Sequence, residues 1–105
     1  MYGYTMHVPA PIEMYHRLHQ AVLEVIDEHG GADGLLLHLA YPVRDGFDLT
    51  ELWETKEEFD AFNRDIFAKA AERAGVPMEE PQPPQVEFTP AGLTTPRVFS
   101  TDADR

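Results

Sequence analysis

The hydrophobic positions of this chain follow two different periods. Across residues 12–29, apolar side chains recur every three or four positions, which is the spacing of a helix that buries one face. Pro11 suits the first turn of such a helix, and Gly30 suits its end, because glycine tolerates the left-handed conformation of a helix cap. The same spacing returns across residues 56–74, and Gly75 follows it. The pattern therefore predicts two amphipathic helices.

Four shorter segments have the composition of β-strands. They are rich in aromatic and branched residues and cover residues 1–8, 35–41, 47–54 and 86–88. Residues 42–46 join the second segment to the third and contain Asp45-Gly46, a pair typical of hairpin turns. The order strand-helix-strand-strand-helix-strand is the ferredoxin-like βαββαβ plan, in which two helices cover one face of a four-stranded antiparallel sheet. We predict an α+β domain of this kind over residues 1–89 and a partly disordered C-terminal extension over residues 90–105.

The start of the second helix has its own signal. Thr55 and Glu58 have the spacing of a capping box, in which the threonine accepts from the N–H of Glu58 and the glutamate reaches back to the N–H of Thr55. Trp53 lies two residues before this cap. The cap therefore predicts a tryptophan fixed where the third strand passes into the second helix.

Strand alternation predicts which side chains of the hairpin share a face. One face carries Leu35, Leu37, Leu39, Tyr41, Phe47, Leu49, Glu51 and Trp53, and the other carries Leu36, His38, Ala40, Asp48, Thr50 and Leu52. The first face is the more apolar, so we expect it to lie against the helices. The first strand of the hairpin is apolar on both faces, so the uncovered face needs a partner, most simply a second copy of the sheet. We therefore predict a homodimer in which two sheets close into an α+β barrel.

The composition narrows the range of functions. The chain has 105 residues, which suits one domain, and 19 acidic against 8 basic residues give a formal net charge of −11. Such a charge repels phosphate backbones and anionic lipids, so we expect no nucleic-acid partner and no membrane partner. The chain has no cysteine, which favours a cytoplasmic location, and no apolar run long enough to predict a signal peptide or a membrane span.

Two segments and the element order resemble a known group of proteins. The segments are residues 34–38 (Gly-Leu-Leu-Leu-His), and residues 51–53 (Glu-Leu-Trp) followed by residues 55–59 (Thr-Lys-Glu-Glu-Phe). Together with the element order over residues 1–89, they resemble the antibiotic biosynthesis monooxygenase-like group of dimeric α+β barrel proteins. The resemblance implies a superfamily that includes cofactor-independent monooxygenases of aromatic polyketides, haem-degrading enzymes, small isomerases and cyclases.

The function that follows from the resemblance is small-molecule binding. The protein is expected to bind a small aromatic or apolar ligand and to act as a cofactor-independent monooxygenase, isomerase or cyclase on an aromatic or polyketide-like compound. The alternative is a non-catalytic ligand-binding or accessory dimerisation protein, since the fold alone does not select the chemistry.

Three residues of the second half are candidates for the site. Glu51 is a carboxylate on an otherwise apolar face, so it is a candidate general base or acceptor for a ligand hydroxyl. The alternative is an ion pair with an arginine such as Arg17 or Arg73, or a position at a solvated end of the sheet. Asn63 falls within the buried stripe of the second helix, where its amide can hold a ligand carbonyl or bond the backbone. For Trp53, the resemblance implies a place in the wall of the cavity between sheet and helices, where it would contact an aromatic ligand; the alternative is a core tryptophan.

The histidines supply the remaining candidates. His19 flanks the stripe of the first helix beside Tyr15, so we expect both to face a ligand and His19 to move a proton. His38 is a further ligand-binding candidate, although alternation places it on the second face, nearer the dimer seam. Glu13 and His16 form one carboxylate-x-x-His element, whereas a di-metal bundle needs two, so we expect no metal site.

The sequence of the second helix also bears on whether the protein binds haem. The resemblance implies that haem-degrading members carry a histidine in this helix as the axial ligand, and Phe62 and Asn63 stand there in this chain. We therefore expect no haem and no other cofactor.

Overall fold

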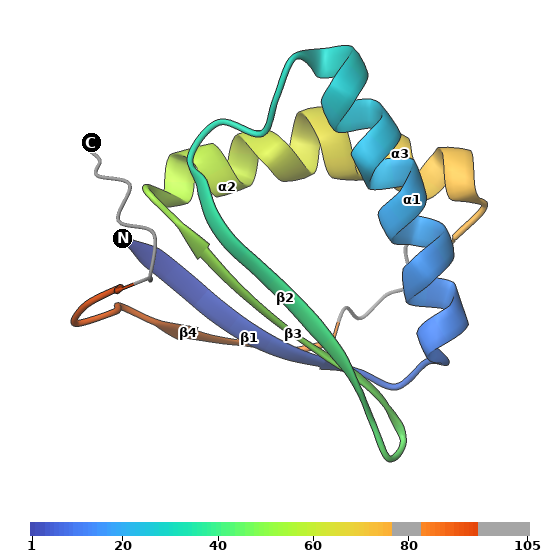
Figure 1. Cartoon of the computed structure of the whole chain (residues 1–105), viewed down its shortest axis with the longest axis horizontal. Coiled ribbons are helices and arrows are strands. Elements are labelled where there is room, and N and C mark those ends of the chain that lie inside the picture. Colours follow the sequence, from blue (N-terminus) through green and yellow to red (C-terminus); the bar gives the residue numbers. More distant parts are fainter. Residues whose placement is uncertain (77–82, 95–105) are drawn as a thin grey trace.

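The computed structural model describes residues 1–76 and 83–94. Strands β1 (Tyr2–Val8), β2 (Leu35–Val43), β3 (Gly46–Trp53) and β4 (Gln85–Phe88) form one sheet in the order β2-β3-β1-β4, with antiparallel neighbours. Helix α1 (Ile12–His29) and a second helical region lie on the same side of this sheet (Figure 1). This arrangement confirms the predicted ferredoxin-like α+β fold.

The element bounds agree with the sequence pattern except at the hairpin and the C-terminus. Strands β2 and β3 extend further toward each other than predicted, and only residues 44 and 45 form the turn between them. Residues 90–94 form no helix or strand. The rest of the predicted C-terminal extension, residues 95–105, lies outside the described residues, as do residues 77–82 of the proline-containing loop.

The second helical region has a π-helical turn in its middle. It consists of α2 (Lys56–Phe62), the π-helical turn η1 (Asn63–Phe67) and α3 (Ala68–Ala74), where the sequence predicts one regular helix. Its first turn has the predicted cap: Thr55 Oγ1 accepts from the N–H of Glu58 at 3.1 Å. The Glu58 carboxylate accepts from the Thr55 hydroxyl at 3.0 Å, rather than from the backbone N–H that the capping box predicts.

The length of the hairpin turn sets the faces of β2. Only two residues separate the strands, so Val43 pairs with Gly46 and His38 pairs with Glu51, whereas the predicted faces require an odd number of turn residues. Residues 37–43 therefore face the side opposite to the predicted one. A β-bulge, in which Leu36 is one extra residue, then returns Leu35 to its predicted side. The predicted faces are correct for β3 and wrong for β2 beyond the bulge.

The corrected faces separate a helix-facing side from an uncovered side. The helix-facing side of β2 and β3 carries Leu35, His38, Ala40, Phe47, Leu49, Glu51 and Trp53. Leu37, Leu39 and Tyr41, which were predicted to lie under the helices, lie on the uncovered side instead. His38, which was predicted to lie near the dimer seam, is on the same side as Glu51.

Two clusters of buried side chains hold the helices to each other and to the sheet. Ala21 and Val25 of α1 pack against Ile66 and Ala70 of the second helical region. Below them, Tyr4, Trp53 and Phe59 form the cluster between the sheet and α2. The cluster of Tyr4, Trp53 and Phe59 fixes the end of β3, and the candidate site depends on the position of that end.

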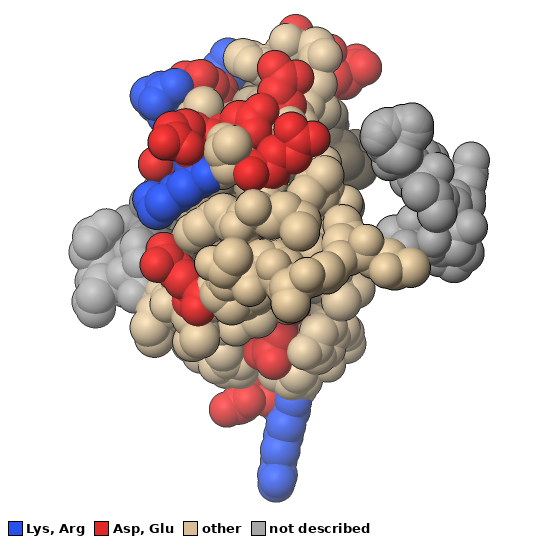
Figure 2. Space-filling view, turned by 90° about the vertical axis from the view of Figure 1, so that its left-hand side faces the viewer, with Lys and Arg blue, Asp and Glu red and all other residues tan. Residues whose placement is uncertain are grey.

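The uncovered side of the sheet is apolar and exposed. Its large side chains are Leu37, Leu39, Tyr41, Val86 and Phe88. A methyl group at Gly3 would meet the Phe88 ring at 2.6 Å, so glycine is what lets this ring cross β1. Figure 2 shows a wide area without charged side chains below a group of acidic ones. Among the described residues, no helix combines the length and the apolar character that crossing a membrane requires.

Candidate functional site

Four side chains on the helix-facing side form a hydrogen-bonded chain. The Glu51 residue lies within β3 and is only 5% exposed. Its Oε1 accepts from the Trp53 indole N–H at 2.9 Å, and its Oε2 lies 2.6 Å from His38 Nδ1. The other ring nitrogen of His38, Nε2, lies 2.7 Å from the hydroxyl oxygen of Tyr15. The chain therefore leads from a buried carboxylate to a part-buried phenol on α1.

The register of the sheet brings these groups together. Glu51 lies directly opposite His38 of β2 and Tyr4 of β1. Trp53 is two residues further along β3 and so points to the same side. The sequence analysis missed the pairing of Glu51 with His38, because that pairing depends on the two-residue length of the turn, and it missed Tyr4. The alternation of Tyr2 and Tyr4 in β1 was the available signal for a tyrosine beside the carboxylate.

His19 adds a third flat ring beside Tyr15 and His38. It lies one helical turn after Tyr15, with ring centroids 5.1 Å apart and an angle of 14° between the planes. Its ring is 5.4 Å from that of His38 and nearly parallel to it, at 8°. The ring of Phe47 lies 5.4 Å from Tyr15. Since Tyr15, His19 and His38 are each half-buried, they form an aromatic group that solvent partly reaches.

The environment sets the resting protonation of two of these rings. Burial, followed by the negative charge of Glu51, raises the pKa of the Tyr15 hydroxyl above its ordinary value. Burial, followed by the neighbouring His38 and His16, lowers the pKa of His19 below its ordinary value. Tyr15 therefore keeps its proton at neutral pH, and His19 is uncharged there.

Glu51 has no arginine partner of the kind considered from the sequence. Arg73 pairs with Glu28 at 2.8 Å, on the surface. Within the described residues, the ion pairs of Glu51 consist of the contact with His38 alone. The Glu51 carboxylate is therefore held by the titratable imidazole of His38 and the indole of Trp53, and the imidazole can gain or lose a proton beside it.

Trp53 and Asn63 have different positions relative to the candidate site. Trp53 is fully buried, and its ring packs against Phe62 at 5.1 Å and Phe59 at 5.8 Å. The indole acts on the site through its bond to Glu51. Asn63 is half-buried at the first position of the π-helical turn, and no hydrogen bond of its side-chain amide is found within residues 1–76 and 83–94. π-Helical turns are frequent at functional sites, so Asn63 remains a candidate.

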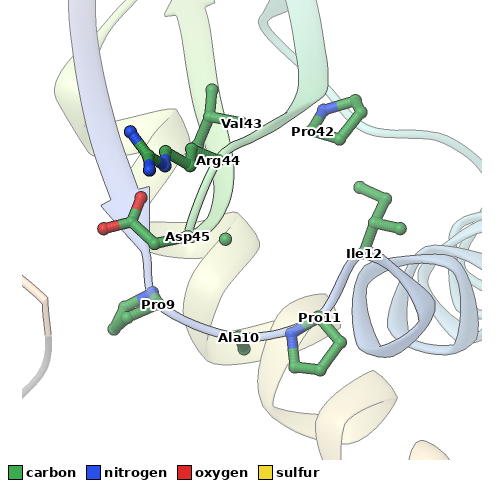
Figure 3. A pocket seen from close by; sticks show the side chains of 9 residues that line it. Pro9, Ala10, Pro11, Ile12, Pro42, Val43, Arg44 and Asp45 are labelled. Carbon is green, nitrogen blue, oxygen red and sulfur yellow. The ribbon is translucent and has the colours of Figure 1, made fainter.

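Two hollows lie away from the hydrogen-bonded chain. One, of about 400 Å³, is at the hairpin end of the sheet, between the segment of Pro11 and Ile12 and the segment of Pro42 and Val43 (Figure 3). The other, of about 240 Å³, lies between the end of α1 and the second helical region, beside Phe62. Neither is lined by Glu51, Trp53 or Asn63, so neither is the predicted cavity between sheet and helices.

The hydrogen-bonded chain has the parts of an acid–base site. A histidine held by a buried carboxylate on one nitrogen can exchange a proton through the other, and that nitrogen here meets a hydroxyl group. In the part of the chain that the structure describes, no group of three or more His, Cys, Asp or Glu residues that could hold a metal ion is found.

Comparison with known proteins gives matches at the level of the fold. No family model matches the chain, and no curated protein does so. Rv0793 from Mycobacterium tuberculosis matches with a TM-score of 0.54 and 13% identity, over 90% of this chain and 97% of that one. The haem-degrader MhuD (Rv3592) from the same organism, solved with two haems in its active site, matches with a TM-score of 0.53 and 17% identity, over 90% and 100% of the two chains.

A third structure of the same fold contains a different ligand. It is a monooxygenase from the gene ActVA-Orf6 of Streptomyces coelicolor in complex with nanaomycin D, with a TM-score of 0.52 and 22% identity, over 91% of this chain and 90% of that one. These likenesses confirm that the chain has the α+β fold of antibiotic biosynthesis monooxygenase-like proteins.

Proposed function

We propose that this protein binds a small ring-bearing molecule beside Tyr15, His19 and His38 and converts it by proton transfer, as a cofactor-independent monooxygenase, isomerase or cyclase. The observation that carries the proposal is the hydrogen-bonded chain from the buried Glu51 through His38 to the part-buried Tyr15. A buried carboxylate that orients a histidine is a common device for general acid–base catalysis.

The aromatic group supplies the binding surface. Flat rings at the protein surface favour ring-bearing ligands, and each stacking contact contributes about 0.5–1.5 kcal/mol beyond area burial. Because His19 is uncharged at neutral pH, it can meet an apolar ring without losing the hydration of a charge. The two ligand-bound structures of the same fold support the idea that such folds accept flat aromatic molecules.

Haem fits this chain less well than a smaller aromatic molecule. Residues 56–74 contain no histidine, cysteine, methionine or tyrosine, the residue types that ligate haem iron. On the sheet, both ring nitrogens of His38 already have partners. The proposed chemistry therefore uses the side chains alone.

A binding measurement tests the proposal. Nanaomycin D titrated into the protein should give saturable quenching of Trp53, the single tryptophan, which contacts Glu51 directly. His19→Ala should weaken binding about tenfold if one stacking contact of about 1.4 kcal/mol is lost. His16→Ala, on the same helix but exposed, is the matched control and should leave binding unchanged.

The outcomes separate the candidate functions. Consumption of dioxygen or formation of a product without added cofactor supports catalysis. Saturable binding without any conversion supports the alternative of a non-catalytic ligand-binding protein. Failure of nanaomycin D and of simple naphthols to bind would contradict the proposal.

We also propose that the protein is a homodimer that covers its exposed sheet face. The support is the row of exposed apolar side chains on that face, where Leu39 is 48% exposed. Leu39→Lys should produce a monomer in sedimentation equilibrium. Leu23 of α1 is equally exposed at 48%, so Leu23→Lys is the matched control and should leave the dimer intact. A wild-type monomer at micromolar concentration would overturn this proposal.

We expect a cytoplasmic location, which the lack of cysteine supports.

A further inference from the structure

The hydrogen-bonded chain has a direction that can be assigned from its donors. An indole N–H only donates, so Glu51 Oε1 is an acceptor from Trp53. Two N–H donors on its two oxygens suit an ionised carboxylate, which places a hydrogen on His38 Nδ1. The other nitrogen, Nε2, then has a lone pair, and the only hydrogen available for the 2.7 Å contact is that of the Tyr15 hydroxyl.

This direction determines what Tyr15 offers to a ligand. Its hydrogen is used in the bond to His38, so the hydroxyl oxygen presents lone pairs on its remaining sides. A ligand carbonyl would bring a second acceptor to that oxygen, which is unfavourable. A ligand hydroxyl would bring the missing donor.

Resting on the proposed function, we propose that the ligand is a phenol or an enol, whose hydroxyl donates to the Tyr15 oxygen and loses its proton through Tyr15 to His38. The O–H bond of the ligand breaks, and its proton forms a new O–H bond on Tyr15. The original Tyr15 proton forms an N–H bond on Nε2 of His38. No electrons are transferred, and the products are a ligand oxyanion and an imidazolium.

The surroundings stabilise these products. The imidazolium lies between the Glu51 carboxylate and Tyr15, and the new Tyr15 O–H donates to the ligand oxyanion. Trp53 is a positioning residue, because its N–H fixes the carboxylate that receives the imidazolium charge. The other titratable groups next to this chain include Tyr4 of β1, which lies opposite Glu51, and His16 and His19 of α1, whose rings lie beside Tyr15. His19 resists protonation, since burial lowers its pKa, and so it does not compete for the proton.

A phenol with distinct acid and anion spectra tests the inference. 4-Nitrophenol bound to the protein should show an apparent pKa about one pH unit below that of the free compound, the size of shift that a nearby charge produces. Tyr15→Phe should abolish this shift. Tyr41→Phe, which removes an exposed hydroxyl on the other side of the sheet, is the matched control and should retain it.

A second variant guards against a folding defect in the first. Glu51→Gln keeps the shape and the bond from Trp53 but removes the charge, so it should also abolish the shift; circular dichroism checks that both variants are folded. An unshifted or raised pKa of bound 4-nitrophenol, or an equal shift in Tyr15→Phe, would overturn the inference.

The methyl ether of the probe distinguishes this inference from the proposed function. 4-Nitroanisole has the same ring but no hydroxyl, so it should bind at least tenfold more weakly than 4-nitrophenol. If the ether and the phenol bind equally, ring binding stands and the inference fails. If neither they nor nanaomycin D bind, the proposed function fails and the inference fails with it.

Discussion

Trp53→Phe is the substitution for which the structure gives the clearest expectation. The indole is fully buried, so a phenyl ring leaves a void of roughly 40 Å³, which costs about 1 kcal/mol at 24 cal/mol per Å³. Phenylalanine also removes the N–H that Glu51 Oε1 accepts, and an unsatisfied buried acceptor costs about 1–3 kcal/mol. We therefore expect a loss of about 2–4 kcal/mol in the free energy of unfolding.

The assay needs a signal that does not depend on the tryptophan. Urea unfolding followed by far-UV circular dichroism provides it, at one fixed protein concentration because association would also contribute to stability. The same substitution in a Glu51→Gln background completes a double-mutant cycle. In that background, the loss in the free energy of unfolding caused by Trp53→Phe should be smaller by about 1 kcal/mol or more, because Glu51→Gln has already removed the charged acceptor.

The reasoning fails if the two residues are not coupled. An equal cost of Trp53→Phe in both backgrounds would show that the indole only fills space. In that case Trp53 would not be a positioning residue for the carboxylate, and the role assigned to its N–H would have to be abandoned.

Four further predictions follow from other parts of the structure. Gly3→Ala should lower stability by about 1–3 kcal/mol, because a methyl group would meet the Phe88 ring at 2.6 Å; an unchanged melting temperature would contradict that contact. The free energy of unfolding should fall as the pH decreases below about 6.5, because the folded state holds the pKa of His19 below its ordinary value and the unfolded chain then binds more protons; His19→Gln should reduce this slope in urea titrations at several pH values. Asn63→Leu should leave stability unchanged or raise it, because no hydrogen bond of the Asn63 side-chain amide is found among the described residues, whereas a purely structural amide would cost about 1–3 kcal/mol in the same unfolding assay. The protein should purify without colour, and haem titration should give no saturable Soret band; a one-to-one endpoint would refute this.

The fold was predictable where local signals are strong. Helix α1 has the predicted bounds because Pro11 and Gly30 mark its two ends by backbone geometry alone. The bulge was not predictable, because it lies in the run Leu35-Leu36-Leu37, and three identical side chains satisfy either register. The π-helical turn was not predictable for a similar reason. Phe62, Ile66 and Phe67 form an apolar face with either the α-helical or the π-helical period.

The residues that the structure brings together around Glu51 were easier to predict than the contacts between them. Glu51 stood out as a lone carboxylate on an apolar face, and the structure buries it on that face. Tyr15 and His19 were paired correctly, since one helical turn separates them. His38 was chosen but placed on the wrong side, because its position depends on the pairing of two strands and not on its own neighbours in sequence.

The two-residue turn makes the chemistry of this sheet depend on the number of residues between His38 and Arg44. With one residue more or fewer in that part of β2, the hairpin would still form, but His38 would pass to the uncovered side and a leucine would take its place beside Glu51. The carboxylate would then lose its titratable partner although no residue had been substituted. Among proteins of this fold, a single-codon insertion or deletion in β2 could therefore separate chains with an acid–base site from chains that only bind, and a comparison by residue identity alone would overlook the difference.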